Sequence, residues 1–323
     1  MDGADQSAHD LPKVVGRIPK GLKPWPQKLQ CVVTHGVSIS MYNILNVVKG
    51  GGNMALTCLM AALQSLGRPL RGTLYLQVDG GSENWNHILF GFIDLLFDLY
   101  SDLQKVIVSR LPVGHTHIDV DRFFSYFNGV LFGTCGGGRS SGKDVYTKPV
   151  FDEMFMSAMS GNKDTMLLDH HIQDVNNVYD WWSFLQPHLY DGFSGYGSSG
   201  AVHVLKFERR QDMSTPHISY KYWNQSTEWL PEDGTTLKVL SSRPDLSDLK
   251  NLKLETHVED YADVLTRLQK PVLKWMTEQR QSGLVTEDDV SCWKAYFKSL
   301  RKCMLIVKSH LVIAIYMSFF LYR

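Results

Sequence analysis

Apolar and β-branched residues alternate or run together in several short segments early in the chain, a pattern typical of strands. The first two segments, Leu29–His35 and Ser38–Val48, are separated at Gly36 and predict a hairpin. Two further segments, GTLYLQVD and KVIVSRL, are rich in apolar residues and predict buried strands. Another strand is expected to end near Asp2.

Between and after these strands, apolar residues recur at helical spacing. The segment MALTCLMAALQSLG has Asn53 as its expected N-cap and ends at Gly67. The segment SENWNHILFGFIDLLFDLY has an almost wholly apolar body, which indicates a helix buried on more than one side. The segment IDVDRFFSYFNGVLFG predicts a third helix that ends at Gly133.

Taken in order, these elements form the series β-β-β-α-β-α-β-α. Strands followed by strand–helix units predict a mixed sheet with helices packed on its faces. The order is that of the ribonuclease-H-like arrangement, which ribonuclease H, retroviral integrases and DDE transposases share. The predicted fold class is therefore α/β, with a ribonuclease-H-like mixed sheet flanked by helices.

The rest of the chain predicts a β-rich part between helical parts. The pattern is helical from Lys148 to about Leu189, and LDHH at Leu168–His171 is interpreted as a surface helix. AVHVLKFERR, PHISYKYW and TTLKVLSS alternate like strands of a small antiparallel unit. The predicted regions are residues 1–195 (core with helical extension), 196–250 (small β-rich region) and 251–323 (helical, ending in an apolar run).

Charge is distributed unevenly although the formal net charge is zero. Between Leu11 and Val78 the chain has eight Lys or Arg residues and no Asp or Glu. Such a segment either presents a positive face to phosphates or is balanced by acidic neighbours on a solvated surface, and charge alone favours neither. On the first interpretation the nucleic-acid-binding candidates are Lys13, Arg17, Lys20, Lys23 and Lys28.

Cysteine usage and the two chain ends bear on localisation. The five cysteines form no CxxC pair, which indicates a reducing intracellular compartment, nuclear or cytoplasmic. The polar N-terminus contains no apolar signal region. The apolar C-terminal run LVIAIYMSFFLYR is shorter than the roughly 20 residues that span a bilayer. A buried helix or an artefactual chain end is favoured over a membrane anchor, which stays open.

Acidic residues occur where the predicted strands and helices would meet. Asp79 ends one strand, Asp119 and Asp121 open the helix after the next strand, and Asp2 lies near the end of the first. Two-metal phosphoryl chemistry needs carboxylates from separate elements to converge on a pair of divalent cations. The sequence therefore predicts a site for two Mg²⁺ or Mn²⁺ ions held by these four residues.

Each candidate also has a structural interpretation. Asp79 precedes glycine and fits a turn, and Asp119 or Asp121 fits a charge that complements a helix dipole. His115 and His117 lack a third nearby His or Cys, which argues against a structural zinc site. They support the carboxylates, by polarising a phosphate or orienting an aspartate, or they hold the loop.

Three stretches carry a resemblance to a known family. MDGADQSAHDLP, LYLQVDGGSEN and LPVGHTHIDVDRFF resemble blocks of an uncharacterised eukaryotic, transposon-related domain family. The blocks read approximately Asp-Gly-x-x-Gln-Ser, Leu-x-x-Asp-x-x-x-x-Glu-Asn and Gly-His-Thr-His-x-x-x-Asp. The resemblance covers most of residues 1 to about 245, and the family is similar to DDE transposases of ribonuclease-H-like fold.

The resemblance assigns roles to the matching positions. Asp2 matches the first acidic position, Asp79 the second and Asp119 or Asp121 the third, with Glu83 and Asn84 as the Glu-Asn pair. It implies a transposase-derived protein that cleaves and joins DNA with Mg²⁺ or Mn²⁺ and needs no small-molecule cofactor. The alternative is a domesticated or fragmentary relic that at most binds nucleic acid; a homo-oligomer is compatible with both.

Overall fold

The structure is a computed structural model of the 323-residue chain. It describes residues 1–3, 9–14, 21–45, 50–110, 119–132, 144–162, 165–175, 177–193, 202–211, 213–255 and 261–306.

Strands and helices alternate along the described chain. The strands are β1 (Asp2–Gly3), β2 (Gln27–Thr34), β3 (Ser38–Leu45), β4 (Gly72–Val78), β5 (Leu103–Arg110), β6 (Asp169–Val175), β7 (Val204–Glu208) and β8 (His217–Lys221). The helices are α1 (Gly52–Ser65), α2 (His87–Leu99), α3 (Asp119–Phe132), α4 (Lys148–Gly161), α5 (Trp181–Leu185), α6 (Tyr261–Gln281) and α7 (Glu287–Ile306), with short 3₁₀ helices at Gln186–His188, Asp191–Phe193 and Leu246–Asn251. Over residues 1–132 the order is β-β-β-α-β-α-β-α, as the apolar pattern predicts.

The first sheet has the order β1-β2-β3-β6. The predicted hairpin is confirmed: β2 and β3 pair antiparallel, from Gln27 opposite Leu45 to Thr34 opposite Ser38. β1 is antiparallel to β2, and β6 is parallel to β3. Residues Ser38–Ile44 of β3 are all buried, because β3 is an inner strand with helices on both faces.

The second sheet has the order β4-β5-β7-β8. β4 and β5 are parallel, as expected for strands joined through a helix. β7 and β8 form the antiparallel pair that the sequence predicts, and β7 also pairs antiparallel with β5. The hairpin of β7 and β8 therefore extends the sheet that contains β4 and β5.

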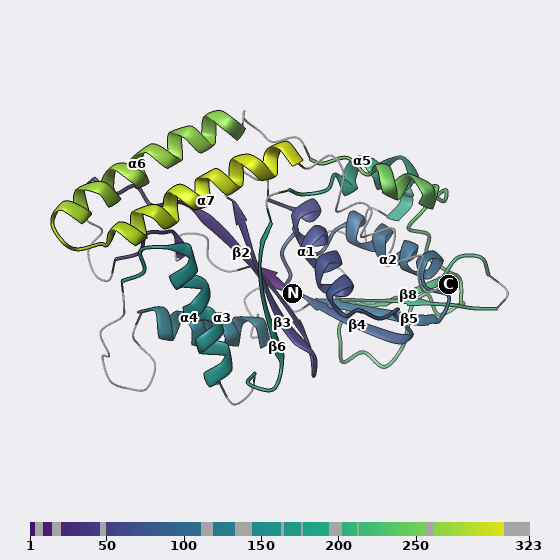
Figure 1. The fold of residues 1–323 in the computed structure, drawn as a ribbon. Coiled ribbons are helices and arrows are strands. Elements are labelled where there is room, and N and C mark those ends of the chain that lie inside the picture. The colour runs from purple at the N-terminus through teal and green to yellow at the C-terminus, as the bar shows by residue number, and fades with distance from the viewer. Residues whose placement is uncertain are drawn as a thin grey trace.

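The two sheets meet at the N-terminus. The amino group of Met1 donates a hydrogen bond of 2.9 Å to the carbonyl oxygen of Gln77, near the end of β4. Figure 1 shows the N-terminus between the strands of the two sheets. The strands therefore follow one another across the molecule as β6-β3-β2-β1-β4-β5-β7-β8.

The described helices cover both faces of the first sheet and one face of the second. Figure 1 shows α1, α2 and α5 on one side, and α3 and α4 against the other side of the first sheet. The body of α2 is buried from Ile88 to Phe97, and its N-terminus is capped by Asn86, whose side chain accepts from the Leu89 N–H. An apolar helix of this kind needs partners on several sides, which the sheet, α1 and α5 provide.

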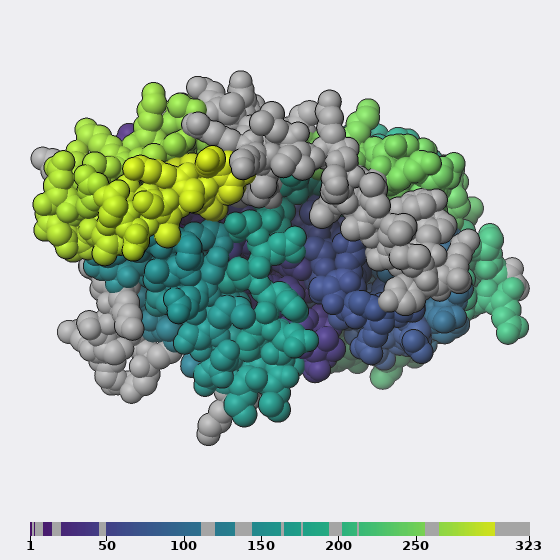
Figure 2. All heavy atoms as spheres, viewed as in Figure 1, coloured from purple at the N-terminus to yellow at the C-terminus, as the bar shows by residue number. Residues whose placement is uncertain are grey.

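The pair of C-terminal helices α6 and α7 packs onto the α4 side, as Figure 2 shows. The indole N–H of Trp293 on α7 donates to the carbonyl of Tyr146, just before α4, at 2.7 Å. Phe297 on α7 meets Trp25 edge-on, with ring centroids 5.1 Å apart. These helices are therefore part of the core and fit the helical region predicted after residue 250.

Two local predictions are wrong. Residues Asp169–Val175, which include part of the LDHH segment, form strand β6 instead of a surface helix. These residues are mostly polar, so the sequence does not show the apolar–polar alternation of a strand. They form a strand because they pair with buried β3. Asn53 does not cap α1, because the helix begins one residue earlier and Asn53 is buried inside it. Its side chain instead accepts from the Trp182 N–H at 2.9 Å, so that a long-range contact replaces the local one.

The third predicted β-segment, TTLKVLSS, forms no named strand, although Leu237 donates from its backbone N–H to the carbonyl of Ile218 in β8. The C-terminal apolar run lies outside the described residues. Within the described part of the chain, no helix is both long and apolar enough to cross a membrane.

Candidate functional site

The ends of several elements meet at one edge of the joined sheets. β4 and β5 are parallel and both finish there, at Val78 and Arg110. β1 lies beside the end of β4 through the contact between Met1 and Gln77. Because β2 runs antiparallel to β1, it starts at this edge, and Lys28 is its second residue. The carboxyl edge of a parallel strand pair is where open α/β sheets place their ligands.

The turn after β4, residues Asp79–Asn86, is held by the side chain of Asp79 (we call it the β4 turn). Asp79 Oδ1 accepts from the Gly81 N–H at 3.2 Å and from Asn84 Nδ2 at 2.6 Å. Both donors are neutral. Among the described residues Asp79 Oδ2 accepts no hydrogen bond, and the side chain is half-buried. One carboxylate oxygen is therefore fixed and the other is available to a ligand.

Gly81 leaves room for the carboxylate of Asp79. A Cβ atom at Gly81 would lie 3.1 Å from Asp79 Oδ2, closer than an ordinary van der Waals contact. A side chain here would make the carboxylate shift by a few tenths of an ångström. The Asp-Gly-Gly sequence thus positions the acid as well as turning the chain.

Asn84 stabilises the β4 turn from the protein interior. The residue is 4% exposed, and its Nδ2 donates to Asp79. Its Oδ1 is buried and accepts no hydrogen bond within the described chain. In a buried side-chain amide, both the oxygen and the nitrogen usually have hydrogen-bond partners. Asn84 is thus a hydrogen-bond partner of Asp79, a contact that the Glu-Asn pair of the sequence does not specify.

Glu83 meets a basic residue of the first sheet. The carboxylate of Glu83 and the ammonium group of Lys28 each lie 3.3 Å from the position that a Cβ of Gly50 would take. The segment before α1 thus brings together one residue predicted to support the acids and one predicted to bind DNA. Glycine at position 50 leaves room for both groups.

Arg110 was not singled out from the sequence. It ends β5, is 3% exposed, and donates from Nε to the carbonyl of Val202 at 3.0 Å. Its guanidinium lies over the ring of Trp85, 4.8 Å from the centroid, so that it packs against the β4 turn. Burial lowers the pKa of Arg110. The signal was the alternation of Val106, Val108 and Arg110, which puts an arginine on the buried face.

The remaining acidic candidates are described in part. Asp2 lies in β1 and Asp119 begins α3, but their side chains lie outside the described set. Asp121 is half-buried in the first turn of α3. Within the described side chains, no group of three or more His, Cys, Asp or Glu residues is placed to hold a metal ion. The predicted supporting residues His115 and His117 lie outside the described residues.

The predicted DNA-binding residues that the structure describes are exposed or half-buried. Lys23 is exposed. Lys13 lies over the ring of Phe132, 3.9 Å from the centroid, and burial lowers its pKa while Asp10 raises it. Arg17 and Lys20 are not among the described residues. Described lysines of this segment are thus spread over several environments.

The molecule is, by its described architecture, a mixed α/β domain with two mixed sheets and an acidic turn at a strand end. The chain belongs to the family defined as domain of unknown function DUF7869, whose model matches residues 20–226. The match includes the LYLQVDGGSEN and VGHTH blocks and ends just after β8. Neither curated proteins nor solved structures give a match to the chain.

Proposed function

We propose that this protein is transposase-derived and cleaves phosphodiester bonds of DNA with divalent metal ions held by carboxylates at the sheet edge. The core would be ribonuclease-H-like. Asp79 is the central ligand, Asp2 lies on the neighbouring strand, and Asp119 or Asp121 is the third acidic residue. The observation that carries the proposal is the β4 turn, which fixes Asp79 and leaves Oδ2 available.

The strand order supports a ribonuclease-H-like core. In the order β3-β2-β1-β4-β5, β1 is the end strand of an antiparallel meander and lies next to a parallel pair, β4 and β5; within the meander, β2 runs opposite to β1 and β3. The contact between Met1 and Gln77 joins the two groups at the position where Asp2 and Asp79 follow in sequence. Carboxylates on adjacent strand ends are what two-metal chemistry requires.

The chemistry of the β4 turn supports a metal ligand over a structural acid. Mg²⁺ and Mn²⁺ prefer carboxylate oxygens, and a carboxylate neutralised by a close cation binds them less well. Among the described residues Asp79 has two amide donors and no salt bridge. Lys28 lies nearby at the same edge, beside Glu83, where an ammonium group would meet a phosphate of the substrate.

The test is metal-dependent cleavage by an Asp79→Asn variant. Supercoiled plasmid and labelled duplexes are incubated with purified full-length protein and Mg²⁺ or Mn²⁺. We expect nicking by the wild type and background levels in Asp79→Asn, because the amide keeps its hydrogen bonds but loses the charge that binds metal. Asp102→Asn is the matched control: Asp102 is exposed and precedes β5, at the opposite edge.

Equal nicking by wild type and Asp79→Asn would overturn the carboxylate site. Absence of cleavage by the wild type with either metal would overturn the enzyme and leave a nucleic-acid-binding relic as the better description.

A further inference from the structure

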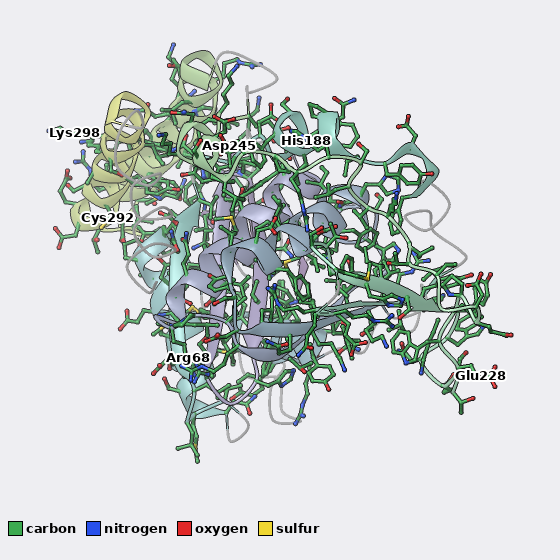
Figure 3. The ribbon with its side chains drawn as sticks, turned by 90° about the vertical axis from the view of Figure 1, so that its right-hand side faces the viewer. Arg68, His188, Glu228, Asp245, Cys292 and Lys298 are labelled. Atoms are coloured by element: carbon green, nitrogen blue, oxygen red, sulfur yellow. The ribbon has the colours of Figure 1, made fainter. Side chains whose placement is uncertain are left out.

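The first sheet ends in a strand edge that pairs with no other segment of the described chain. In the series β6-β3-β2-β1-β4-β5-β7-β8, the outer edge of β8 is closed by backbone hydrogen bonds with Leu230 and Leu237. β6, at the other end, pairs only with β3. Figure 3 shows Glu228, which follows β8, at one side of the molecule and the pale teal ribbon of the α4 and β6 region at the other.

The outward backbone groups of β6 are regularly spaced. Asp169 donates from its N–H to the carbonyl of Val37 at 2.8 Å, so it faces β3. Because backbone groups alternate along a strand, the N–H and C=O of His170, Ile172 and Asp174 point away from β3. None of these groups has a hydrogen-bond partner among the described residues. β6 also contains no lysine, proline or bulge, which commonly block such an edge.

Helix α4 runs along this edge in the direction opposite to β6. At its start, Lys148 forms an ion pair with Asp174, 2.9 Å away. Near its end, the hydroxyl group of Ser160 lies 3.4 Å from Nδ1 of His170. Figure 1 shows α4 beside β6, and Figure 2 shows teal atoms of this region at the surface. The helix and the strand therefore form one surface of the molecule together.

The middle of this surface is apolar. Residues four apart lie on the same side of a helix, which places Met156 between Asp152 and Ser160. Asp152 shares Lys148 with one end of β6, and Ser160 contacts the other end, so Met156 lies level with Ile172 at the centre of the strand. Met156 is 37% exposed and Ile172 is half-buried. We call the outer edge of β6 with these two side chains the β6 edge.

The two ends of the β6 edge differ in charge. At one end Lys148 is shared by Asp152 and Asp174, at 2.6 and 2.9 Å, so that one ammonium group faces two carboxylates. Burial raises the pKa of Asp152 and the charge of Asp174 adds to this rise, whereas Lys148 lowers the pKa. At the other end is His170, whose imidazole becomes a cation when it takes up a proton. The edge therefore has an acidic end, an apolar centre and a basic end.

We propose that the β6 edge pairs with the β6 edge of a second copy of this chain, antiparallel about a twofold axis at Ile172. His170 would then lie opposite the partner's Asp174 at both ends of the interface. His170, Ile172 and Asp174 would each exchange both backbone hydrogen bonds with the partner. The surplus acid of each copy meets an imidazole, and Met156 and Ile172 are covered by their counterparts. The inference goes beyond the proposed function and does not depend on it.

A second copy fits the β6 edge because the edge is complementary to itself. His170 and Asp174 lie at the same distance on either side of Ile172, which is what a twofold interface requires. An axis shifted by one residue, to His171 or Gln173, would place Ile172 opposite His170 or Asp174 of the other copy. Only the axis at Ile172 matches apolar with apolar and acid with base.

The first experiment measures the mass of the purified full-length protein by sedimentation velocity at increasing concentration. We expect the wild type to convert from monomer to dimer. Ile172→Pro removes an N–H that no described residue accepts, so pairing with β3 is kept and the variant should fold. The same change removes the central hydrogen bonds of the dimer, and we expect the dissociation constant to rise at least about tenfold. Leu284→Gln is the matched control, because Leu284 is 47% exposed in the turn between α6 and α7.

Two substitutions of His170 separate charge from structure. Both His170→Asp and His170→Lys remove the imidazole that contacts Ser160. The aspartate would add an acid opposite the partner's Asp174 and weaken the dimer by about tenfold, whereas the lysine would keep or strengthen it. A purely structural role of His170 would move both variants in the same direction.

Disulfide cross-linking tests the register. Directly opposed residues in such a pair have Cα atoms about 5.5 Å apart, a distance that a disulfide can bridge. Ile172→Cys should therefore form a covalent dimer on mild oxidation, seen by non-reducing electrophoresis against the wild-type background. Leu167→Cys is the control: Leu167 is 89% exposed but five residues from the axis, so its two copies would be on the order of 30 Å apart.

The inference is overturned by a wild type that stays monomeric at every concentration, or by a dimer that Ile172→Pro leaves unchanged. Equal weakening by Leu284→Gln, equal effects of the two His170 variants, or equal cross-linking of the two cysteine variants would also contradict it. Each of these results can be obtained whether or not the protein cleaves DNA. Failure of the dimer and failure of the proposed function are therefore distinguishable.

Discussion

Two aspartates have opposite surroundings: Asp79 in the turn after β4, and Asp94 on helix α2. Asp94 on α2 is 3% exposed and is paired with Arg243, which also reaches Asp98. Asp79 in the β4 turn is half-buried and receives hydrogen bonds from two neutral donors. A buried carboxylate needs a cation to offset its loss of hydration, whereas a partly solvated one does not.

The difference separates a structural acid from a candidate functional one. Arg243 links the segment after the β-rich part to α2, so that the ion pair fixes the tertiary structure. At Asp79 the donors orient the carboxylate without neutralising it. An acid that is oriented and still charged can bind a metal ion, and an acid that is already paired cannot do so without breaking the pair.

The largest expected effect is on stability, from Arg243→Ala. Removing the cation leaves the buried Asp94 carboxyl without its partner, so that it either stays charged at a cost or takes up a proton, and we expect a loss of about 3–5 kcal/mol of the free energy of unfolding. Urea denaturation at pH 7.5 measures it. A loss below about 1 kcal/mol would show that the Asp94 pair is not structural.

The pH dependence of stability sharpens the same contrast. Burial raises the pKa of Asp94 from 3.8 to about 6, and Arg243 opposes this. Since the folded state binds the proton more tightly than the unfolded state, the stabilising contribution is complete below pH 4 and is lost as the pH rises through about 6. We expect Asp94→Asn to flatten this part of the wild-type profile by on the order of 1–3 kcal/mol. Identical profiles would contradict the assignment.

Gly81→Ala tests the orientation of Asp79. The added Cβ would meet Asp79 Oδ2 at 3.1 Å, so the carboxylate must move. We expect a loss of about 1 kcal/mol in stability, together with weaker binding of Mn²⁺ in isothermal titration calorimetry. Unchanged Mn²⁺ affinity in a folded variant would argue against a metal at this oxygen.

The smallest stability change is expected for Asp79→Asn. The amide oxygen can still accept from Gly81 and Asn84, so the free energy of unfolding should stay within about 0.5 kcal/mol of the wild type and of Asp102→Asn. A loss as large as that of Arg243→Ala would make Asp79 structural and remove the contrast drawn here.

Much of the fold could be predicted because the apolar pattern of residues 1–132 is locally consistent. The hairpin of β2 and β3, the buried helix α2 and the parallel strands β4 and β5 all follow from it. β6 could not be recognised, because its Asp, His and Gln side chains carry no strand signal until β3 is beside it. The union of β7 with β5 depends on residues about a hundred positions apart, such as Lys105 and Glu208, which spacing along the chain does not reveal.

The candidate site was predictable to the level of single acids. Asp79 follows an apolar strand, so its position at an edge is readable from the sequence. Its bond to Asn84, the packing of Arg110 on Trp85 and the approach of Lys28 to Glu83 arise from tertiary contacts. Whether Asp2, Asp119 and Asp121 join Asp79 stays a prediction.

The pairing of β7 with β5 has a consequence for how the chain folds. β5 is complete at residue 110, yet its second partner begins at Val204. During synthesis, an apolar strand edge must therefore wait for nearly a hundred further residues, and such edges promote aggregation. β7 closes this edge of β5, and β8 then pairs with the outer edge of β7; both strands lie within the family match, which ends at residue 226. A fragment that stops near residue 195 would expose the edge permanently, so the shortest soluble fragment should include β8.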